Sequence, residues 1–295
     1  MKRACLVYDS TSNINTKLYK DVFLLPQQII ETSSINENTY KDLVDIFPDA
    51  MAKKMIDGST FKTAASNPAD AIQLFDQLSK QYEEIFVFLI PNTLSYGQNN
   101  VVSLVAEDFP NVHIIPHYMI SFMSQWELDE LLLLNKTGKL TVKTATTVVN
   151  KYRDKLGALL IVPDLSYLIK GGRISRTRGF IGKLLKVTAL CSFDKLGINF
   201  FAKALTTNKI TTQIEKYFHE TFKDFDYSKI SKVGIMRSTI TSKDFDMNKY
   251  QSLIENTIFP KIDKKILKSI TIQEAPGVVL AHMGPNYIAV SILMK

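Results

Sequence analysis

The feature that most constrains the fold is an alternation of short apolar runs with helical patterns. Runs rich in β-branched and aromatic residues occur at 4–8, 85–90, 112–115 and 158–162. This alternation is typical of a parallel sheet with helices on its faces. The clearest helix is predicted to begin at Pro68, with Asn67 as its N-cap. Further helices are expected at 97–109, 120–136 and 145–156.

The pattern changes after about residue 160. Two apolar segments, 187–193 and 198–205, flank Asp194-Lys195-Leu196-Gly197, which is typical of a hairpin whose glycine supplies a positive φ. Helices are expected at 211–224 and 247–258, and strands at 231–236, 267–273, 277–282 and 287–293. Since about 150 residues make one domain, 295 residues suggest two. We therefore predict an α/β fold, with a parallel-sheet α/β domain at 1–157 and an α+β domain at 158–295.

Composition excludes several classes of protein. The chain is 45% hydrophobic and 22% charged, as in globular proteins, and no apolar run approaches the roughly 18 residues of a membrane helix. Cys5 and Cys191 lack disulfide-framework or zinc spacing, which favours reduced thiols in a cytoplasmic protein. No metal site is expected from the four histidines of the chain. The chain also lacks the GxxxxGK[ST], GxGxxG and GxSxG signatures of nucleotide-binding proteins and hydrolases.

The positive charge of the chain is concentrated in one segment. Six basic residues and no acidic residue occur from Lys170 to Lys186, whereas the net charge of the whole chain is +7. Such a patch would attract an acidic partner, an anionic ligand, a membrane surface or nucleic acid, and its sign does not choose among them.

Small polar residues follow the predicted strands of the first domain. Asp9-Ser10-Thr11-Ser12 follows the first strand, at the sheet edge where α/β proteins bind ligands, although turn and capping residues give the same pattern. Thr63 precedes the Pro68 helix, and Ser95 follows the strand at 85–90. Two loops of neutral donors suit a carboxylate or phosphate group. His282 is open to two interpretations, a hydrogen-bonded loop histidine or a site residue.

The most specific segment runs from Asp164 to Ser175. Gly171-Gly172 permits close backbone approach, and Arg173 carries five donors. The run from Tyr167, YLIKGGRISRTRGFIGKLLK, resembles the YLxKGGRIS…GxLLxIKP block of the DegV family. Four other windows agree in order and spacing with that family. VYDSTS at 7–12 resembles the family's VTDST, and KTAASNP at 62–68 resembles KTSQPSP. LS at 94–95 occupies the place of the family's LSGTYQ, and AHMGP at 281–285 resembles AHxGPG.

The resemblance implies a function and a site. DegV proteins are bacterial fatty-acid-binding proteins that serve as acyl-carrying subunits of fatty acid kinase. Their fold is an N-terminal α/β domain and a C-terminal α+β domain with one fatty acid buried between them. The residues that map to its carboxylate site are Thr63, Ser95, Arg173 and His282, and those of nearby loops are Ser10, Thr11 and Ala64.

By this resemblance we expect a carrier and not an enzyme. The ligand is a long-chain fatty acid in a buried tunnel, no cofactor is required, and a separate ATP-dependent kinase forms the acyl phosphate for phospholipid precursor metabolism. That kinase is expected to dock at Arg173, Arg176 and Arg178. We expect no nucleic-acid partner and no stable membrane insertion, only transient membrane contact.

This chain also departs from the family pattern. Ala64, Ala65, Tyr96 and Gly97 stand where the family usually has Ser, Gln, Gly and Thr, and Pro116 replaces a usual Asp. These departures leave open a lipid-binding relative without the kinase role. Two rival interpretations remain. One is a nucleic-acid-binding regulator that uses the 170–186 patch, and the other is a hydrolase that uses Ser10, Ser95 or Ser175. Phe180 is the one aromatic residue within that patch, which argues against nucleic acid.

Overall fold

The computed structural model describes residues 2–32, 36–174, 188–194 and 196–295. Contacts divide the chain into two compact units. The first comprises Met1–Phe47, Ser59–Asp154 and Pro276–Val279, and the second comprises Pro48–Gly58, Lys155–Ala275 and Leu280–Lys295. The two consecutive domains expected from the sequence differ from these units at 48–58, 155–157 and 276–279.

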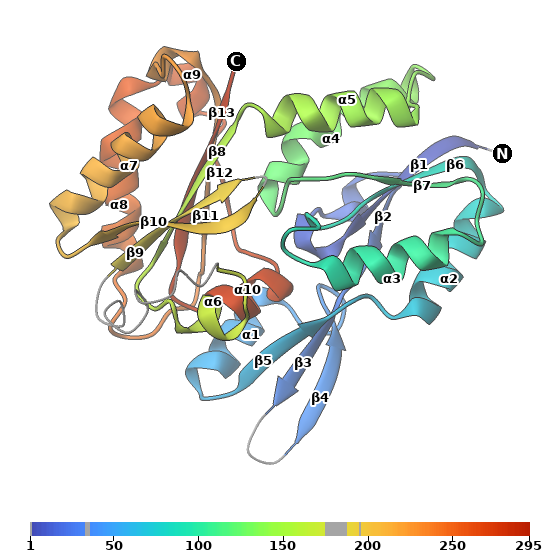
Figure 1. The fold of residues 1–295 in the computed structure, drawn as a ribbon, viewed down its shortest axis with the longest axis horizontal. Helices are drawn as coiled ribbons and strands as arrows, with labels where there is room; N and C mark the ends of the chain where they lie inside the picture. Colours follow the sequence, from blue (N-terminus) through green and yellow to red (C-terminus); the bar gives the residue numbers. More distant parts are fainter. Residues whose placement is uncertain (1, 33–35, 175–187, 195) are drawn as a thin grey trace. The chain divides into compact units, whose positions relative to one another are not determined.

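The first unit contains a four-stranded parallel sheet with helices on both faces (Figure 1). The strands are β1 (Lys2–Asp9), β2 (Val22–Leu25), β6 (Tyr82–Phe88) and β7 (Val112–Ile115), in the order β2-β1-β6-β7. Helices α2 (Pro68–Ser79) and α3 (Tyr96–Ala106) cover one face, and α4 (Phe122–Lys136) and α5 (Val142–Arg153) cover the other.

Alternate residues of β1 enter two separate cores. Leu6 and Tyr8 pack with Leu128 of α4, whereas Cys5 and Val7 pack with the apolar face of α2. Because successive side chains of a strand point to opposite faces, a strand covered on both sides must be apolar throughout. The continuous run at 4–8 is therefore explained by its place in the middle of a three-layer unit.

A small antiparallel sheet completes the first unit. Its strands are β3 (Gln28–Thr32), β4 (Glu37–Lys41) and β5 (Thr60–Ala64), in the order β4-β3-β5. Strand β5 ends shortly before α2, whose N-cap Asn67 accepts a 2.9 Å hydrogen bond from the amide of Ala69, as the sequence predicts. This sheet, which the sequence did not reveal, fixes the position of Thr63.

The second unit is built on a six-stranded mixed sheet. Its order is β10-β9-β8-β13-β11-β12, and neighbours are antiparallel except for β11 and β12. The strands are β8 (Leu156–Val162), β9 (Thr188–Asp194), β10 (Gly197–Ala204), β11 (Ile230–Arg237), β12 (Thr271–Gln273) and β13 (Ile288–Met294). Helices α7 (Thr207–Thr221) and α8 (Met247–Ile258) pack on this sheet, and Ile214 of α7 and Ile254 of α8 share a core with Val290 of β13.

Shorter elements complete the structure. The remaining helices are α1 (Pro48–Ile56), α6 (Ser166–Lys170), α9 (Lys264–Leu267) and α10 (Gly277–Met283), and 3-10 turns occur at Ser10–Ser12, Thr16–Leu18, Tyr227–Lys229 and Phe259–Lys261. The predicted hairpin is confirmed as β9 and β10, with Gly197 at φ 103° and Lys195 outside the described residues. Across the described ranges, no helix has the length and apolar character needed to cross a membrane.

The sequence pattern groups the run at 158–162 with the parallel strands, whereas the predicted boundary after residue 157 places it in the second domain, and only the grouping is wrong. The run at 158–162 is β8, which pairs antiparallel with β9 and β13 in the second unit. The fourth strand of the parallel sheet is instead β2. A continuous apolar run indicates a strand buried on both faces but not the sheet to which it belongs, which explains the error.

Two further strand predictions were wrong in part or in whole. The segment 267–273 contains the end of α9 and only the three-residue strand β12, and 277–282 lies in helix α10. Val278 and Val279 favour a strand locally. However, the Asp42 carboxylate accepts hydrogen bonds from the amides of Gly277 (3.0 Å) and Val278 (3.3 Å) and so caps the helix. A cap so distant in sequence leaves no local signal.

Candidate functional site

A buried carboxylate organises the carboxyl edge of the parallel sheet. Asp9 Oδ1 accepts hydrogen bonds from the amide (3.1 Å) and hydroxyl of Thr11, and Oδ2 accepts from Gln27 Nε2 (3.0 Å) and the Ile90 amide (2.6 Å). Burial raises the pKa of Asp9, whereas these donors and the nearby charge of His117 oppose the rise. The Asp9–Ser12 loop is therefore braced internally, in agreement with its interpretation as a capping turn.

A second buried carboxylate adjoins the same loop. Ser10 Oγ accepts a 3.2 Å hydrogen bond from the Gln27 amide, and the Ser10 hydroxyl also bonds to Asp42. Burial raises the pKa of Asp42 to about 7, against the opposing effect of Ser10 and of the α10 amides. Ser10 and Thr11 are both completely buried, so the structure places them as supports of the loop.

The two donor loops predicted from the sequence lie together. The Ser66 amide donates to Gln98 Oε1 (2.7 Å), and Gln98 Nε2 donates back to Ser66 Oγ (2.9 Å). Ser95 is the N-cap of α3, where its Oγ accepts from the Gln98 amide at 3.4 Å. This reciprocal bridge joins the segment after Thr63 to the segment that carries Ser95, and both of these side chains are partly buried.

Sequence reasoning missed Ser66, Gln98 and Asp42. Ser95 and Gln98 have the S-x-x-Q spacing of a capping box, which could have drawn attention to Gln98. In the structure only half of that box forms, because the Gln98 side chain turns to Ser66. Asp42 carries no comparable signal, since its partners in α10 are separated from it by most of the chain.

In the second unit, the Gly-Gly-Arg and Ala-His-Met-Gly motifs interlock. A Cβ built on Gly171 would lie 2.2 Å from Nδ1 of His282, and one built on Gly284 would lie 2.5 Å from Cδ2 of Tyr167. Arg173 Nη1 donates a 2.7 Å hydrogen bond to the carbonyl of Gly171. The missing side chains of the two glycines therefore allow the segments to pack, and this contact joins the predicted residues Arg173 and His282.

The electrostatics of this contact favour an anion. Burial, followed by the charge of Arg173, lowers the pKa of His282 to about 4, so its imidazole is neutral at pH 7 and has one N–H donor. Burial also lowers the pKa of Arg173, whose guanidinium is about half buried. A partly desolvated cation beside a neutral imidazole suits a carboxylate or a phosphate.

Part of the predicted docking patch lies outside the described residues. Arg176, Arg178 and Ser175 fall within 175–187, together with most of the basic segment. Of that segment, the structure describes Lys170–Ile174, in which Lys170 is exposed.

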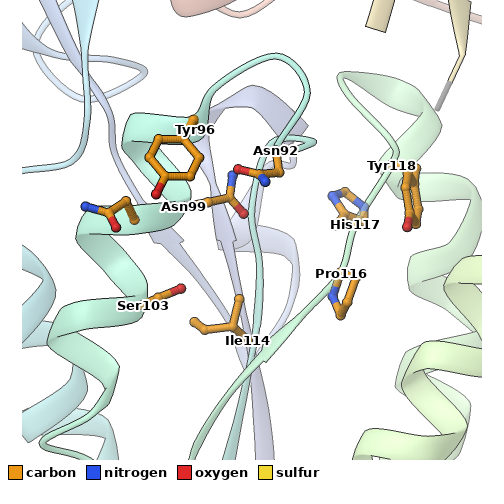
Figure 2. A pocket seen from close by; sticks show the side chains of 9 residues that line it. Asn92, Tyr96, Asn99, Ser103, Ile114, Pro116, His117 and Tyr118 are labelled. Carbon is orange, nitrogen blue, oxygen red and sulfur yellow. The ribbon is translucent and has the colours of Figure 1, made fainter. Parts of the chain in front are cut away.

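A pocket of about 420 Å³ lies in the first unit, between α3 and the segment that follows β7 (Figure 2). Tyr96, Asn99 and Ser103 come from α3, and Pro116, His117 and Tyr118 come from the facing segment. Its other lining residues are Asn92, Asn100 and Ile114. Two departures from the DegV sequence pattern, Tyr96 and Pro116, therefore meet at one pocket, which Thr63 and Ser95 do not line.

Comparison with known proteins settles the family. The family model described as "Uncharacterised protein, DegV family" matches residues 4–295. The chain belongs to the DegV family. A DegV domain-containing protein of Staphylococcus aureus (strain N315) is 24% identical over 299 residues, covering 100% of both chains. Another, from Mycoplasma genitalium, is 24% identical over 294 residues, covering 97% of this chain and 98% of the relative.

Solved DegV structures share the fold. A Thermus thermophilus DegV protein has a TM-score of 0.80 at 20% identity, covering 99% of this chain and 100% of its own. A Streptococcus agalactiae DegV protein has a TM-score of 0.79 at 20% identity, with 100% of both chains covered. Both are described as fatty acid binding. The predicted family and α/β fold class are thus confirmed, while the roles of individual site residues stay predictions.

Proposed function

We propose that this DegV protein binds a long-chain fatty acid and presents its carboxylate to a separate ATP-dependent kinase. Relatives of the same fold support the ligand class. Besides the two proteins above, a DegV structure from Eubacterium eligens is loaded with heptadecanoic acid (TM-score 0.71, 15% identity). A protein from Eubacterium ventriosum is described as stearic acid-binding (TM-score 0.72, 21% identity).

The contact of His282 with Gly171, beside Arg173, is the observation that carries the proposal. It provides a neutral imidazole donor and a half-buried guanidinium in one place. We assign Thr63 and Ser95 as hydroxyl donors to the same carboxylate. About fifteen methylene groups at about 0.8 kcal/mol each contribute roughly 12 kcal/mol before association costs. The acyl chain thus supplies most of the affinity, and the polar residues fix the orientation.

The kinase supplies the phosphoryl-transfer chemistry. A carboxylate oxygen of the fatty acid attacks the γ-phosphorus of ATP, the bond from that phosphorus to the ADP oxygen breaks, and acyl phosphate and ADP result. In this proposal Arg173 stabilises the charge that develops during transfer, and Arg176 and Arg178 contact the kinase. The chain is then a carrier, and the sequence signature of a nucleotide-binding loop is absent from it.

The first test compares ligands with different head groups. Delipidated protein is titrated with palmitate and with hexadecanol, which has the same chain length. We expect one palmitate per chain and at least tenfold weaker binding of the alcohol, because the alcohol lacks the charged carboxylate that the four assigned residues bind together. Equal affinities would show that these residues do not hold the carboxylate. A DNA probe bound with a steep salt dependence would favour a nucleic-acid-binding regulator instead.

The second test separates carrying from transfer. Arg173→Ala should retain a folded, lipid-loaded protein but lower acyl phosphate formation with a cognate kinase and ATP by about tenfold or more. Lys170→Ala removes an exposed cation from the same segment and should leave turnover unchanged. Normal turnover in Arg173→Ala would remove this residue from the mechanism. A wild type without turnover but with bound lipid would identify a DegV relative outside the kinase pathway.

A further inference from the structure

A buried ion pair lies behind the loop that carries Ser95. His117 Nε2 lies 2.6 Å from Glu127 Oε1, and Nδ1 lies 3.2 Å from the carbonyl oxygen of Leu89. Only 2% of the His117 side chain and none of the Glu127 side chain is exposed. Because a carbonyl oxygen and a carboxylate both accept, each ring nitrogen must donate. With Glu127 ionised, this geometry requires the doubly protonated imidazolium.

Charged and aromatic groups surround His117 from three elements. Strand β1 brings Asp9 and the ring of Tyr8, β6 brings the ring of Phe88, and α4 brings Glu127. The two aromatic rings stack on each other with centroids 4.7 Å apart, and each lies 5.8 Å from the imidazole centroid. Burial alone would lower the pKa of His117. The charges of Glu127 and Asp9, together with the hydrogen bonds to Glu127 and to the Leu89 carbonyl, outweigh burial and raise it.

The same pair controls the start of the donor loop. His117 donates to the Leu89 carbonyl, and the next amide, that of Ile90, donates to Asp9. Asn99 Nδ2 then donates to the carbonyls of Ile90 (2.8 Å) and Ser95 (3.0 Å). Hydrogen bonds therefore fix the loop at its first residues and again at the end that enters α3. Those at the first residues depend on the charge of His117.

We propose that His117 and Glu127 are positioning residues that hold the Ser95 loop in its ligand-binding geometry. Glu127 keeps His117 protonated, and the imidazolium both binds the Leu89 carbonyl and neutralises the field at Asp9. Within the described ranges, Glu127 Oε2 has no hydrogen-bond partner, so His117 is the group that compensates this buried charge. The effect on fatty-acid affinity rests on the function proposed above.

The sign of the pH dependence follows from the raised pKa. A histidine whose folded pKa lies above about 6.5 contributes its full stabilisation below that pH and loses it as pH rises through the folded pKa. Palmitate affinity should accordingly be retained near pH 6 and fall on the alkaline side. Asp42 titrates near pH 7 in the same unit, so the profile must be compared between variants and not interpreted alone.

The deciding variant is Glu127→Gln, which keeps an acceptor for His117 but removes the charge. A partly exposed pair on the same sheet, His113 on β7 and Glu84 on β6, gives the matched control Glu84→Gln. Imidazole ¹⁵N spectra, hydrogen exchange of the Ile90 amide and palmitate titrations from pH 6 to 9 are recorded for the wild type and both variants.

We expect both ring nitrogens of His117 to be protonated at pH 7 in the wild type and one to be deprotonated in Glu127→Gln. The variant should show about tenfold faster Ile90 exchange, unchanged exchange elsewhere in the sheet, and about tenfold weaker palmitate binding at pH 7.5. The fall of palmitate affinity with rising pH should begin at a lower pH in Glu127→Gln than in the wild type. Glu84→Gln should match the wild type.

A neutral His117 in the wild type at pH 7, or wild-type exchange and affinity in Glu127→Gln, would overturn the proposal. If Glu127→Gln does not fold, the wild type alone tests the proposal. Its Ile90 amide must exchange faster as His117 loses its proton with rising pH, and an exchange rate that does not follow the titration of His117 contradicts the proposal. If the wild type binds no fatty acid, the proposed function fails, whereas the ring spectra and the Ile90 exchange still decide whether the pair positions the loop.

Discussion

The imidazole of His282 lies so close to Gly171 that a Cβ on this glycine would be 2.2 Å from Nδ1. The neighbouring Gly172 has a different requirement: no atom of the residues that the structure describes lies within 4 Å of its Cβ position, but its φ is +66°. One glycine of the pair is thus needed for a contact, and the other for a backbone conformation.

Replacing each glycine by alanine should separate these roles. Gly171→Ala should displace His282 and weaken palmitate binding about tenfold, which corresponds to about 1.4 kcal/mol. Gly172→Ala should lower the free energy of unfolding by about 1 kcal/mol through its left-handed backbone and leave affinity unchanged. Palmitate titration and chemical denaturation of both variants check this expectation, and the opposite pattern of effects would refute it.

Substitution of the proposed hydroxyl donors can be compared with the loss of an N-cap in another helix. Thr63→Val and Ser95→Ala should each weaken palmitate binding by about 1–2 kcal/mol, the scale for losing one donor to a buried acceptor. Ser95→Ala also removes the N-cap of α3. Thr141→Ala removes the N-cap of α5 and serves as its control, since affinity should not change. Unchanged binding in the Thr63→Val, Ser95→Ala double variant would place the carboxylate elsewhere.

The buried His282 should make the protein less stable in acid. Its folded pKa of about 4 lies below the ordinary value of about 6.5, so the unfolded chain binds more protons between these values. The free energy of unfolding should therefore fall by up to about 3 kcal/mol as pH drops from 6.5 to 4. Denaturation of the wild type and of His282→Gln across this range measures the effect. Parallel pH profiles would contradict a neutral buried imidazole.

Asp42 should have a pH dependence of the opposite direction. Its folded pKa of about 7 lies above the ordinary value of about 3.9, so folding takes up a proton between these values. The stability of the wild type relative to Asp42→Asn should thus decrease, by up to about 4 kcal/mol, as pH rises from 4 to 7. Denaturation at pH 5 and pH 8 checks the difference. A constant difference would indicate that Asp42 is ionised throughout this range.

Local patterns predicted those elements whose signals are local. Asn67 and Pro68 mark the start of α2, and Asp194 to Gly197 mark the β9–β10 hairpin, because capping and turn residues act on their immediate neighbours. The sheet membership of β8 and the helical state of α10 depend on partners far away in sequence. No periodicity carries that information.

The residues of the candidate site also differ in whether a local motif marks them. Ser95 and Arg173 could be singled out because each stands in a motif of distinct composition. The bond of Gln98 to Ser66 and the pairing of His117 with Glu127 arise only when separate loops and helices meet. The spacing of histidines along the chain does not reveal a buried ion pair with a glutamate of another element.

Native mass spectrometry of the protein as purified, with lipid extraction of the same sample, tests fatty-acid binding most directly. We expect a mass increment of one long-chain fatty acid per chain, and recovery of that increment when delipidated protein is given labelled palmitate. Protein that is free of lipid as purified, and that takes up no labelled palmitate after delipidation, would contradict the account.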